Sequence, residues 1–274
     1  MSSSANGKKK NGFHLSKWYL DFVGADGTVV IGYAAKLGWH SYSVPYSNLL
    51  VNKPGTAPYQ LSSFRKVTMP VISEEEITWD PENLKVSGKW IKKSNSIEEK
   101  LVSTEEGFLN WQCYQPRAEV ELEIEGSTIK GAGYVEELVM TIPAWKIPMN
   151  ELRWGHVVSD DYCIVWIEIK EKDSKQWVWV NDDPVEASTI NEDEILIPAL
   201  KLKIALEQKR ILESEQKIKS VVRNLKRFLP GFDKILPAKF LMADSIKWYS
   251  EARLIRNDEL VSSGQCVHEL VKFN

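Results

Sequence analysis

Two short stretches, one near the end of each half of the chain, share the pattern Val-x-Glu-Leu and indicate an internal repeat. The first is Gly131-Ala-Gly-Tyr-Val-Glu-Glu-Leu138 and the second is Ser263-Gly-Gln-Cys-Val-His-Glu-Leu270. The openings of the halves also correspond, because Trp18–Val23 and its hairpin partner resemble Leu152–Val157 followed by Cys163–Glu168. Self-similarity in the same order is typical of a duplicated unit. We therefore interpret the chain as two copies of one unit.

Most of the chain is predicted to form antiparallel β-strands. Trp18–Val23 and Thr28–Ala34 are rich in β-branched and aromatic residues and flank an Asp-Gly turn, which is the pattern of a hairpin. Glu119–Ile124 alternates strictly between charged and apolar residues, as a strand with one wet face does. Many short strands separated by turns predict a sandwich or barrel. Further strands are expected at Glu76–Trp79, Leu84–Ile91, Gly107–Gln112 and Thr128–Thr141.

Polar and proline-rich segments set the expected boundaries. Residues 1–14 are predicted to be a flexible tail, since the first twelve are polar and rich in Ser, Asn, Gly and Lys. Two prolines interrupt the strand pattern in Ile142–Met149, so the first domain is expected at 15–145 and the second at 146–274. Trp145, between those prolines, is predicted to fill the gap between the domains.

One amphipathic helix is predicted at about 214–229. Apolar residues recur there at helical spacing, basic residues lie mostly on the other face, and Pro230-Gly231 ends the pattern. The segment before it is ambiguous, because Leu200–Ile204 alternates like a strand whereas Ala205–Glu215 favours a helix. A basic amphipathic helix can close the end of a barrel or make peripheral contact with an anionic membrane.

Composition narrows the classes of partner. The chain has 11 Trp, 9 Tyr and 8 Phe, and such residues collect in β cores and ligand cavities. The formal net charge of -3 creates no positive field, so no nucleic acid is expected as a partner. The N-terminal residues lack the apolar stretch of a secretion signal, and no apolar run is long enough to span a bilayer. We expect a cytoplasmic protein with no transmembrane segment.

Several kinds of site are not expected. The three cysteines, Cys113, Cys163 and Cys266, are widely spaced and form no Cys-x-x-Cys pair, and no two of the four histidines have metal-ligand spacing. No Gly-x-Ser-x-Gly elbow, glycine-rich phosphate loop or dinucleotide fingerprint occurs. We therefore predict no metal and no cofactor.

The two repeated segments contain the candidate catalytic residues. Neighbouring side chains on a strand point to opposite faces, so Tyr134 and Glu136 share one face, and Cys266 and His268 share one. If these faces line the barrels, Glu136 and His268 are interior acid–base groups, since a shielded carboxyl has a raised pKa and can donate a proton. If the opposite faces point inward, the glutamates are structural and pair with Arg153 or Arg117.

Aromatic and polar residues on the predicted strands are the candidates for ligand contact. His156 follows Trp154-Gly155 beside Arg153 and could reach a ligand, although a satisfied polar residue is the alternative. The predicted ligand-binding residues are Trp18, Tyr33, Trp111, Tyr134, Arg153, Trp154, His156 and Trp166.

Four of these segments together resemble one known group of proteins. Trp18–Phe22, Gly131–Glu137, Leu152–His156 and the closing Val267–Glu269 look like motifs of the carotenoid 1,2-hydratase (hydroxyneurosporene synthase) and AttH-like tandem lipocalin-like proteins. The resemblance implies two calycin barrels that hold an apolar ligand within or between them, without a metal or nucleotide. Relatives in this group hydrate carotenoid double bonds or steer the cyclisation of polyenes.

The resemblance extends to individual positions of the first repeated segment. Tyr134 matches the aromatic residue of the motif, Glu136 stands where the hydratases have Asp, and Glu137 stands where they have His. The predicted fold class is thus mainly β, with two tandem lipocalin-like (calycin) antiparallel β-barrel or sandwich domains and an amphipathic helix in the C-terminal part.

Three functions are consistent with the sequence. The first is binding of a hydrophobic isoprenoid- or polyketide-like small molecule, with acid–base hydration, isomerisation or cyclisation if the site is catalytic and Glu136 as proton donor. The second is a non-catalytic lipid or pigment carrier with the same aromatic lining. The third is a carbohydrate- or partner-binding β module, which would expose several Trp side chains. The sequence leaves the oligomeric state open.

Overall fold

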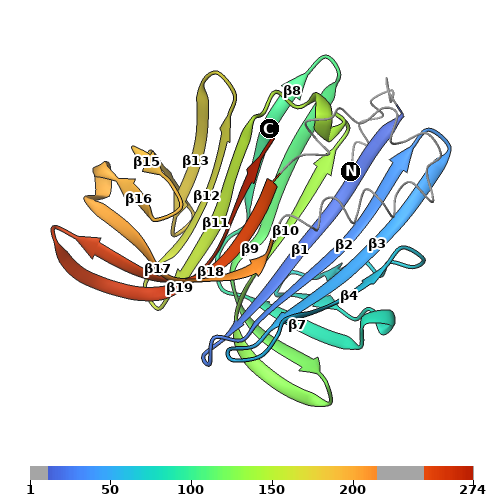
Figure 1. Cartoon of the computed structure of the whole chain (residues 1–274), viewed down its shortest axis with the longest axis horizontal. Coiled ribbons are helices and arrows are strands. Elements are labelled where there is room, and N and C mark those ends of the chain that lie inside the picture. The colour runs from blue at the N-terminus through green and yellow to red at the C-terminus, as the bar shows by residue number, and fades with distance from the viewer. Residues whose placement is uncertain (1–11, 215–243, 274) are drawn as a thin grey trace.

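Two curled antiparallel sheets lie side by side in the computed structural model, which describes residues 12–214 and 244–273 (Figure 1). The strands of the first sheet are β1 (Phe13–Gly24), β2 (Val29–Trp39), β3 (Tyr42–Asn52), β4 (Tyr59–Ser63), β5 (Val71–Ile72), β6 (Glu76–Trp79), β7 (Val86–Lys92), β8 (Ile97–Thr104), β9 (Gly107–Ile124) and β10 (Ser127–Met140). Those of the second are β11 (Glu151–Ser159), β12 (Cys163–Lys170), β13 (Ser174–Val180), β14 (Asp183–Val185), β15 (Thr189–Ile190), β16 (Glu194–Ile197), β17 (Leu202–Glu213), β18 (Asp244–Arg256) and β19 (Glu259–Lys272). The predicted mainly β class with two antiparallel units is confirmed.

Both sheets follow one plan. The first strand of each lies between the second strand and the last, in the orders β4-β3-β2-β1-β10-β9-β7-β6-β5 and β14-β13-β12-β11-β19-β18-β17-β16-β15, with β8 paired to β9. A short 3-10 helix stands at the same place in each, η1 (Glu82–Leu84) before β7 and η3 (Pro198–Leu200) before β17. Each ends in a lysine with a left-handed backbone, Lys85 and Lys201. The connector contains η2 (Ala144–Lys146).

Three expectations about individual segments need correction. Gly107–Gln112 and Glu119–Ile124 are parts of the single strand β9, and β1 begins at Phe13, inside the segment expected to be a tail. The helix tendency of Ala205–Glu215 is wrong as far as Glu213, because β17 pairs with β18 and this pairing outweighs local propensity. The predicted helix at about 214–229 lies outside the described residues, apart from Ser214.

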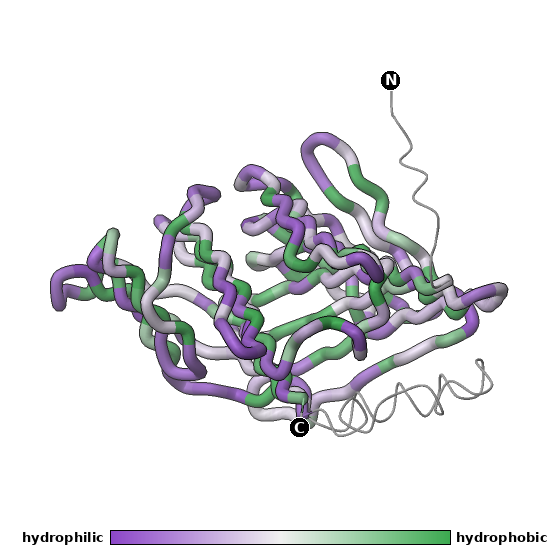
Figure 2. The backbone as a smooth tube through the Cα atoms, turned by 90° about the horizontal axis from the view of Figure 1, so that it is seen from above, coloured by the Kyte–Doolittle hydropathy of each residue, from purple (hydrophilic) through white to green (hydrophobic). Residues whose placement is uncertain are grey.

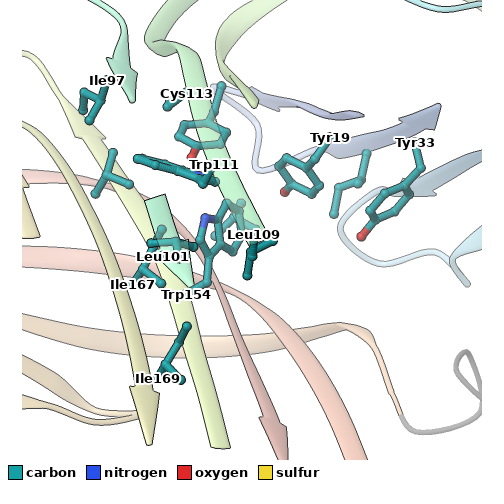
Figure 3. Packing of buried hydrophobic residues seen from close by; sticks show 14 of the residues in the cluster. Tyr19, Tyr33, Ile97, Leu101, Leu109, Trp111, Cys113, Trp154, Ile167 and Ile169 are labelled. Carbon is teal, nitrogen blue, oxygen red and sulfur yellow. The ribbon is translucent and has the colours of Figure 1, made fainter. Parts of the chain in front are cut away.

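Apolar side chains form three clusters. The first-barrel core lies on one face of the first sheet, and the second-barrel core lies on one face of the second. Hydrophobic segments run through the strands of both sheets (Figure 2). A third cluster, here called the seam, joins the other faces of the two sheets (Figure 3). The first-barrel core includes Trp18, Leu20, Phe22, Trp79, Trp90 and Val135, the second-barrel core includes Val157, Ile164, Trp166, Ile204 and Cys266, and the seam includes Tyr19, Tyr33, Trp111, Tyr134, Trp154, Trp179 and Val267.

The seam is where residues from both halves meet. Trp111 on β9 stacks on Trp179 on β13 with ring centroids 5.1 Å apart, and Tyr19 on β1 meets Trp154 on β11 edge-on at 5.0 Å. In the connector, Trp145 stacks on Trp39 at 5.2 Å and packs against the seam. These aromatic pairs bury large areas and add their own attraction. Among the described residues, no helix is long and apolar enough to cross a membrane.

Candidate functional site

The polar centre of the seam lies on the paired strands β1 and β10. Each carries a tyrosine followed two residues later by a carboxylic acid, Tyr19 with Asp21 and Tyr134 with Glu136. The antiparallel register places Tyr19 opposite Glu136 and Asp21 opposite Tyr134. Each tyrosine hydroxyl donates to the acid on its own strand, at 2.8 Å to Asp21 Oδ2 and 2.7 Å to Glu136 Oε2. Since residues two apart share a face, the four side chains form one buried patch.

One carboxyl oxygen of Glu136 accepts three hydrogen bonds. Besides Tyr134, the indole Nε1 of Trp111 donates to Oε2 at 2.5 Å and that of Trp154 donates at 3.1 Å. Trp154 belongs to the second sheet, so both halves of the chain hold this carboxyl. An indole N–H can only donate, and Oε2 is therefore an acceptor. A proton carried by Glu136 resides on Oε1.

The surroundings make Glu136 a weak acid. Burial raises the pKa of its carboxyl, while the hydrogen bonds from Tyr134 and Trp111 and the charges of Lys17 and Lys247 lower it by a smaller amount. The side chain is buried, and the donors that contact it are neutral. A carboxyl with a raised pKa keeps its proton closer to neutral pH and can act as a general acid.

Asp21 joins the two sheets through a histidine. His156 Nε2 on β11 lies 2.6 Å from Asp21 Oδ2, and both side chains are fully buried. The imidazole ring stacks on Tyr134, with centroids 4.4 Å apart and planes 10° apart. Asp21 Oδ1 and His156 Nδ1 have no hydrogen-bond partner among the described residues, which is costly for buried polar atoms.

A buried lysine of the second sheet also contacts the aromatic residues of the seam. Lys247 on β18 is 1% exposed, and its Nζ is 2.8 Å from Glu269 Oε2. The same ammonium lies 4.8 Å from the centre of the Tyr19 ring and 4.6 Å from that of Trp154. Burial alone would raise the pKa of Glu269, but the charges of Lys247 and Lys17 and the hydrogen bonds from Lys247 and Ser245 lower it to about 2. Glu269 is thus held ionised.

The other predicted catalytic residue, His268, lies on the opposite face of the second sheet. Its Nε2 is 2.8 Å from Ser250 Oγ, and its ring stacks on Trp248 at 5.0 Å. Burial, together with the charges of Lys209 and Lys247, lowers the pKa of His268 to about 3. Inside the second barrel this histidine is neutral and is separated from Glu136 by the sheet.

The side chains of Trp166 and Arg153 also lie on the second-barrel face of the second sheet. A Cβ atom on Gly155 would lie 2.3 Å from the Trp166 ring, so only glycine fits there. Arg153 pairs with Glu151 at 2.7 Å and with Glu192 at 3.0 Å, which is a structural ion-pair arrangement. Neither residue reaches the seam.

The structure therefore divides the predicted site. It brings Glu136 together with Tyr134, Trp111, Trp154 and His156 in the seam, and places Tyr33 there too, with its hydroxyl 3.1 Å from Glu213. It places Trp18, Arg153, Trp166 and His268 elsewhere, because these side chains point into the first or second barrel.

Sequence reasoning did not assign Tyr19, Asp21 or Lys247 to the site, and it considered Glu269 only as a structural residue. The signal for the first two was the Tyr-x-acid spacing of Tyr19 and Asp21, which repeats that of Tyr134 and Glu136. An acid at the centre of an otherwise apolar strand needs a buried partner. No comparable pattern marks Lys247.

A pocket of about 560 Å³ opens at one end of the seam. Its lining includes Ala132 on β10 and Val158 on β11, which are two residues from Tyr134 and His156 along their strands, about 7 Å. Gln265 also lines it and donates to the Gly24 carbonyl across the seam at 3.0 Å. The buried patch thus lies next to a solvent-accessible opening. Over residues 12–214 and 244–273, no group of three His, Cys, Asp or Glu side chains could hold a metal ion.

Known structures share this architecture over nearly the whole chain. Kievitone hydratase from Nectria haematococca has a TM-score of 0.51 at 11% identity, covering 96% of this chain and 89% of its own. CghA has a TM-score of 0.52 at 8% identity, covering 96% and 88%, and was also solved with Sch210972. A putative AttH from Nitrosomonas europaea has a TM-score of 0.48 at 10% identity, covering 96% and 93%.

No protein-family model and no curated protein sequence matches the chain. At identities near one in ten, the likeness to kievitone hydratase and CghA is one of fold. The chain therefore has the tandem, mainly β architecture of these two proteins, and its chemistry has to be argued from its own residues.

Proposed function

We propose that the chain binds a hydrophobic small molecule in the seam and converts it by proton transfer, with Glu136 as the proton donor. The single observation that carries the proposal is the setting of Glu136. It is a buried carboxyl whose Oε2 accepts hydrogen bonds from Trp111, Tyr134 and Trp154, so its proton is confined to Oε1. A positioned acid with a raised pKa has the properties that general acid catalysis requires.

The aromatic side chains of the seam favour an apolar ligand of isoprenoid or polyketide type. The rings of Tyr19, Trp111 and Trp154 come together in the seam from both sheets (Figure 3), and the two indoles donate to the carboxyl of Glu136. Their electron-rich faces suit an alkene that becomes positively charged when it accepts a proton. The fold supports the same view by analogy, because kievitone hydratase is named as a hydratase.

Proton donation by Glu136 defines the class of reaction. Proton transfer from Glu136 Oε1 to an alkene carbon begins hydration, isomerisation or cyclisation alike. None of these steps needs electron transfer. We assign no role in them to His268, which faces the second barrel with Ser250.

The test has two stages. The first is native mass spectrometry of the protein purified from its own host, followed by extraction of any bound compound. The second measures turnover of that compound by the wild type and by Glu136→Gln. Glutamine keeps an acceptor oxygen for the indole donors but has no acidic proton, so affinity should change little while turnover falls at least about 100-fold. Unchanged turnover would overturn the assignment of Glu136, and an extract with no compound that the protein binds would overturn the ligand class.

A further inference from the structure

The proposed reaction leaves one buried polar pair unused. Asp21 is 0% exposed and His156 is 2% exposed, yet they come from different sheets and meet at 2.6 Å in the middle of an apolar cluster. Burying a carboxyl and an imidazole costs free energy that apolar residues would not cost. If this pair only held the two sheets together, two apolar side chains in contact would do the same at a lower cost in free energy.

We infer that His156 is the proton acceptor of the same reaction and that Asp21 is its positioning residue. This inference rests on the proposed function. It names a second catalytic atom, Nδ1 of His156, beside the Oε1 donor of Glu136.

Hydrogen-bond geometry assigns the atoms. Asp21 Oδ2 already accepts the Tyr19 hydroxyl, so the hydrogen between Asp21 and His156 is assigned to His156 Nε2. In the neutral ring the other nitrogen, Nδ1, then carries a free lone pair. That atom is buried without a partner in the described parts of the chain. A base whose second nitrogen is fixed by a carboxylate is the arrangement that prepares histidine to take up a proton.

Two aromatic residues contact both the donor and the acceptor. Tyr134 donates to Glu136 and stacks on the His156 ring. Trp154 also donates to Glu136, and its ring centroid is 5.7 Å from that of His156. A ligand carbon near Oε1 and a hydrogen near Nδ1 would therefore belong to one molecule held against the same rings.

The proton balance closes without a further reagent. The O–H bond of Glu136 breaks as an alkene electron pair forms a new C–H bond, which leaves the adjacent carbon electron-deficient. The Nδ1 lone pair takes a proton from a neighbouring C–H or O–H bond, and the electron pair of that bond fills the deficient carbon. The products are ionised Glu136 and protonated His156, which return to their starting forms by proton exchange with water.

Turnover variants test the role of His156 against a matched control. The compound obtained from the host is turned over by the wild type, His156→Gln, Asp21→Asn and His268→Gln, each checked for folding by circular dichroism. His156→Gln should lose about 100-fold in kcat with its affinity retained. His268→Gln, also a buried histidine of the second sheet, should keep wild-type turnover. Wild-type turnover by His156→Gln would overturn the inference, whereas wild-type turnover by Glu136→Gln would overturn the proposed donor.

A pH profile separates a base from a structural residue. General-base catalysis gives a pH–rate profile with an acid limb, because the base must be unprotonated. Asp21→Asn removes the charge that favours the imidazolium, so this acid limb should move to lower pH. The other titratable groups facing the pair, Tyr19, Tyr134, Glu136, Lys247 and Glu269, are unchanged in this variant. An acid limb that does not move would overturn the inference.

A measurement on the unliganded wild type adds an independent check. Nitrogen NMR of the histidine rings should find the hydrogen of neutral His156 on Nε2 and none on Nδ1. A hydrogen on Nδ1 with a bare Nε2 would overturn the inference whatever the ligand is.

Discussion

Glu136 and Glu269 occupy equivalent places in the two sheets but have opposite acidities. Each lies on the last strand of its sheet, opposite an aromatic residue of the first strand, Tyr19 for Glu136 and Trp154 for Glu269. Both belong to the seam side of their sheets. Yet burial raises the pKa of Glu136, while the charges of Lys247 and Lys17 and the hydrogen bonds from Lys247 and Ser245 together outweigh burial and lower the pKa of Glu269 to about 2.

The difference comes from the donors that each carboxyl receives. Glu136 takes hydrogen bonds from neutral indole and phenol groups, whereas Glu269 takes one from an ammonium. Neutral donors stabilise the anion without a net positive charge, so they only partly offset burial. At Glu269 the ammonium of Lys247 acts together with Lys17 and Ser245, and their sum exceeds the effect of burial. The same position in the fold therefore gives a proton donor in one half and a fixed negative charge in the other.

The largest expected effect comes from removing the ammonium. Lys247→Met leaves the partly buried charge of Glu269 without its ammonium partner, so the free energy of unfolding should fall by roughly 2 kcal/mol near neutral pH. Chemical denaturation of the wild type and the variant measures this loss. Lys247→Met combined with Glu269→Gln removes both charges and should recover much of it.

The pH dependence of the same pair has a defined sign. In the wild type the folded pKa of Glu269 is about 2, below its ordinary value in an unfolded chain. The unfolded chain thus binds the proton first, and this stabilisation is fully present above about pH 4.5 and is lost as the pH falls towards 2. Lys247→Met should flatten this part of the stability profile. An equal acid dependence in the variant would mean that Lys247 does not set the acidity of Glu269.

The second expected effect concerns the neutral donors of Glu136. Trp111→Phe removes one hydrogen bond to the carboxylate but keeps an aromatic ring, so the pKa of Glu136 should rise further. Since the donor must be protonated, the alkaline limb of the pH–rate profile should move to higher pH as well. Trp179→Phe is the matched control, because Trp179 stacks on Trp111 and has no hydrogen bond to Glu136 among those of the described chain. An identical shift in both variants would assign the effect to packing.

The pattern of strands and the tandem plan could be predicted from the sequence because they depend on local alternation and turn residues. Trp18–Val23 and Glu119–Ile124 form strands as their patterns predict. Ala205–Glu213 does not follow its helix tendency, since its strand is fixed by pairing with a partner that comes some forty residues later along the chain. Such pairing leaves no local signal.

The candidate site could be predicted only in part, and the repeat itself misled the comparison. The sequence echo aligns Glu136 with His268, but Val135 lies in the first-barrel core while Val267 lies in the seam. The echo is thus one residue out of phase with the structure, and a one-residue shift moves every side chain to the other face. The structural counterpart of Glu136 is Glu269, which periodicity alone could not reveal.

The smallest expected effect tests whether the seam holds the two sheets together at its open end. Gln265 on β19 donates to the Gly24 carbonyl on β1 at 3.0 Å, beside the pocket. Gln265→Leu should lower the free energy of unfolding by about 1 kcal/mol. Gln115→Leu is a matched change, because Gln115 also donates to a backbone carbonyl at 3.0 Å, that of Trp90, but within the first sheet. Hydrogen exchange should quicken at the facing ends of β1 and β19 in the first variant and only around β7 and β9 in the second. Equal protection of β1 and β19 in the two variants would mean that the bond between Gln265 and Gly24 does not keep the pocket end of the seam closed.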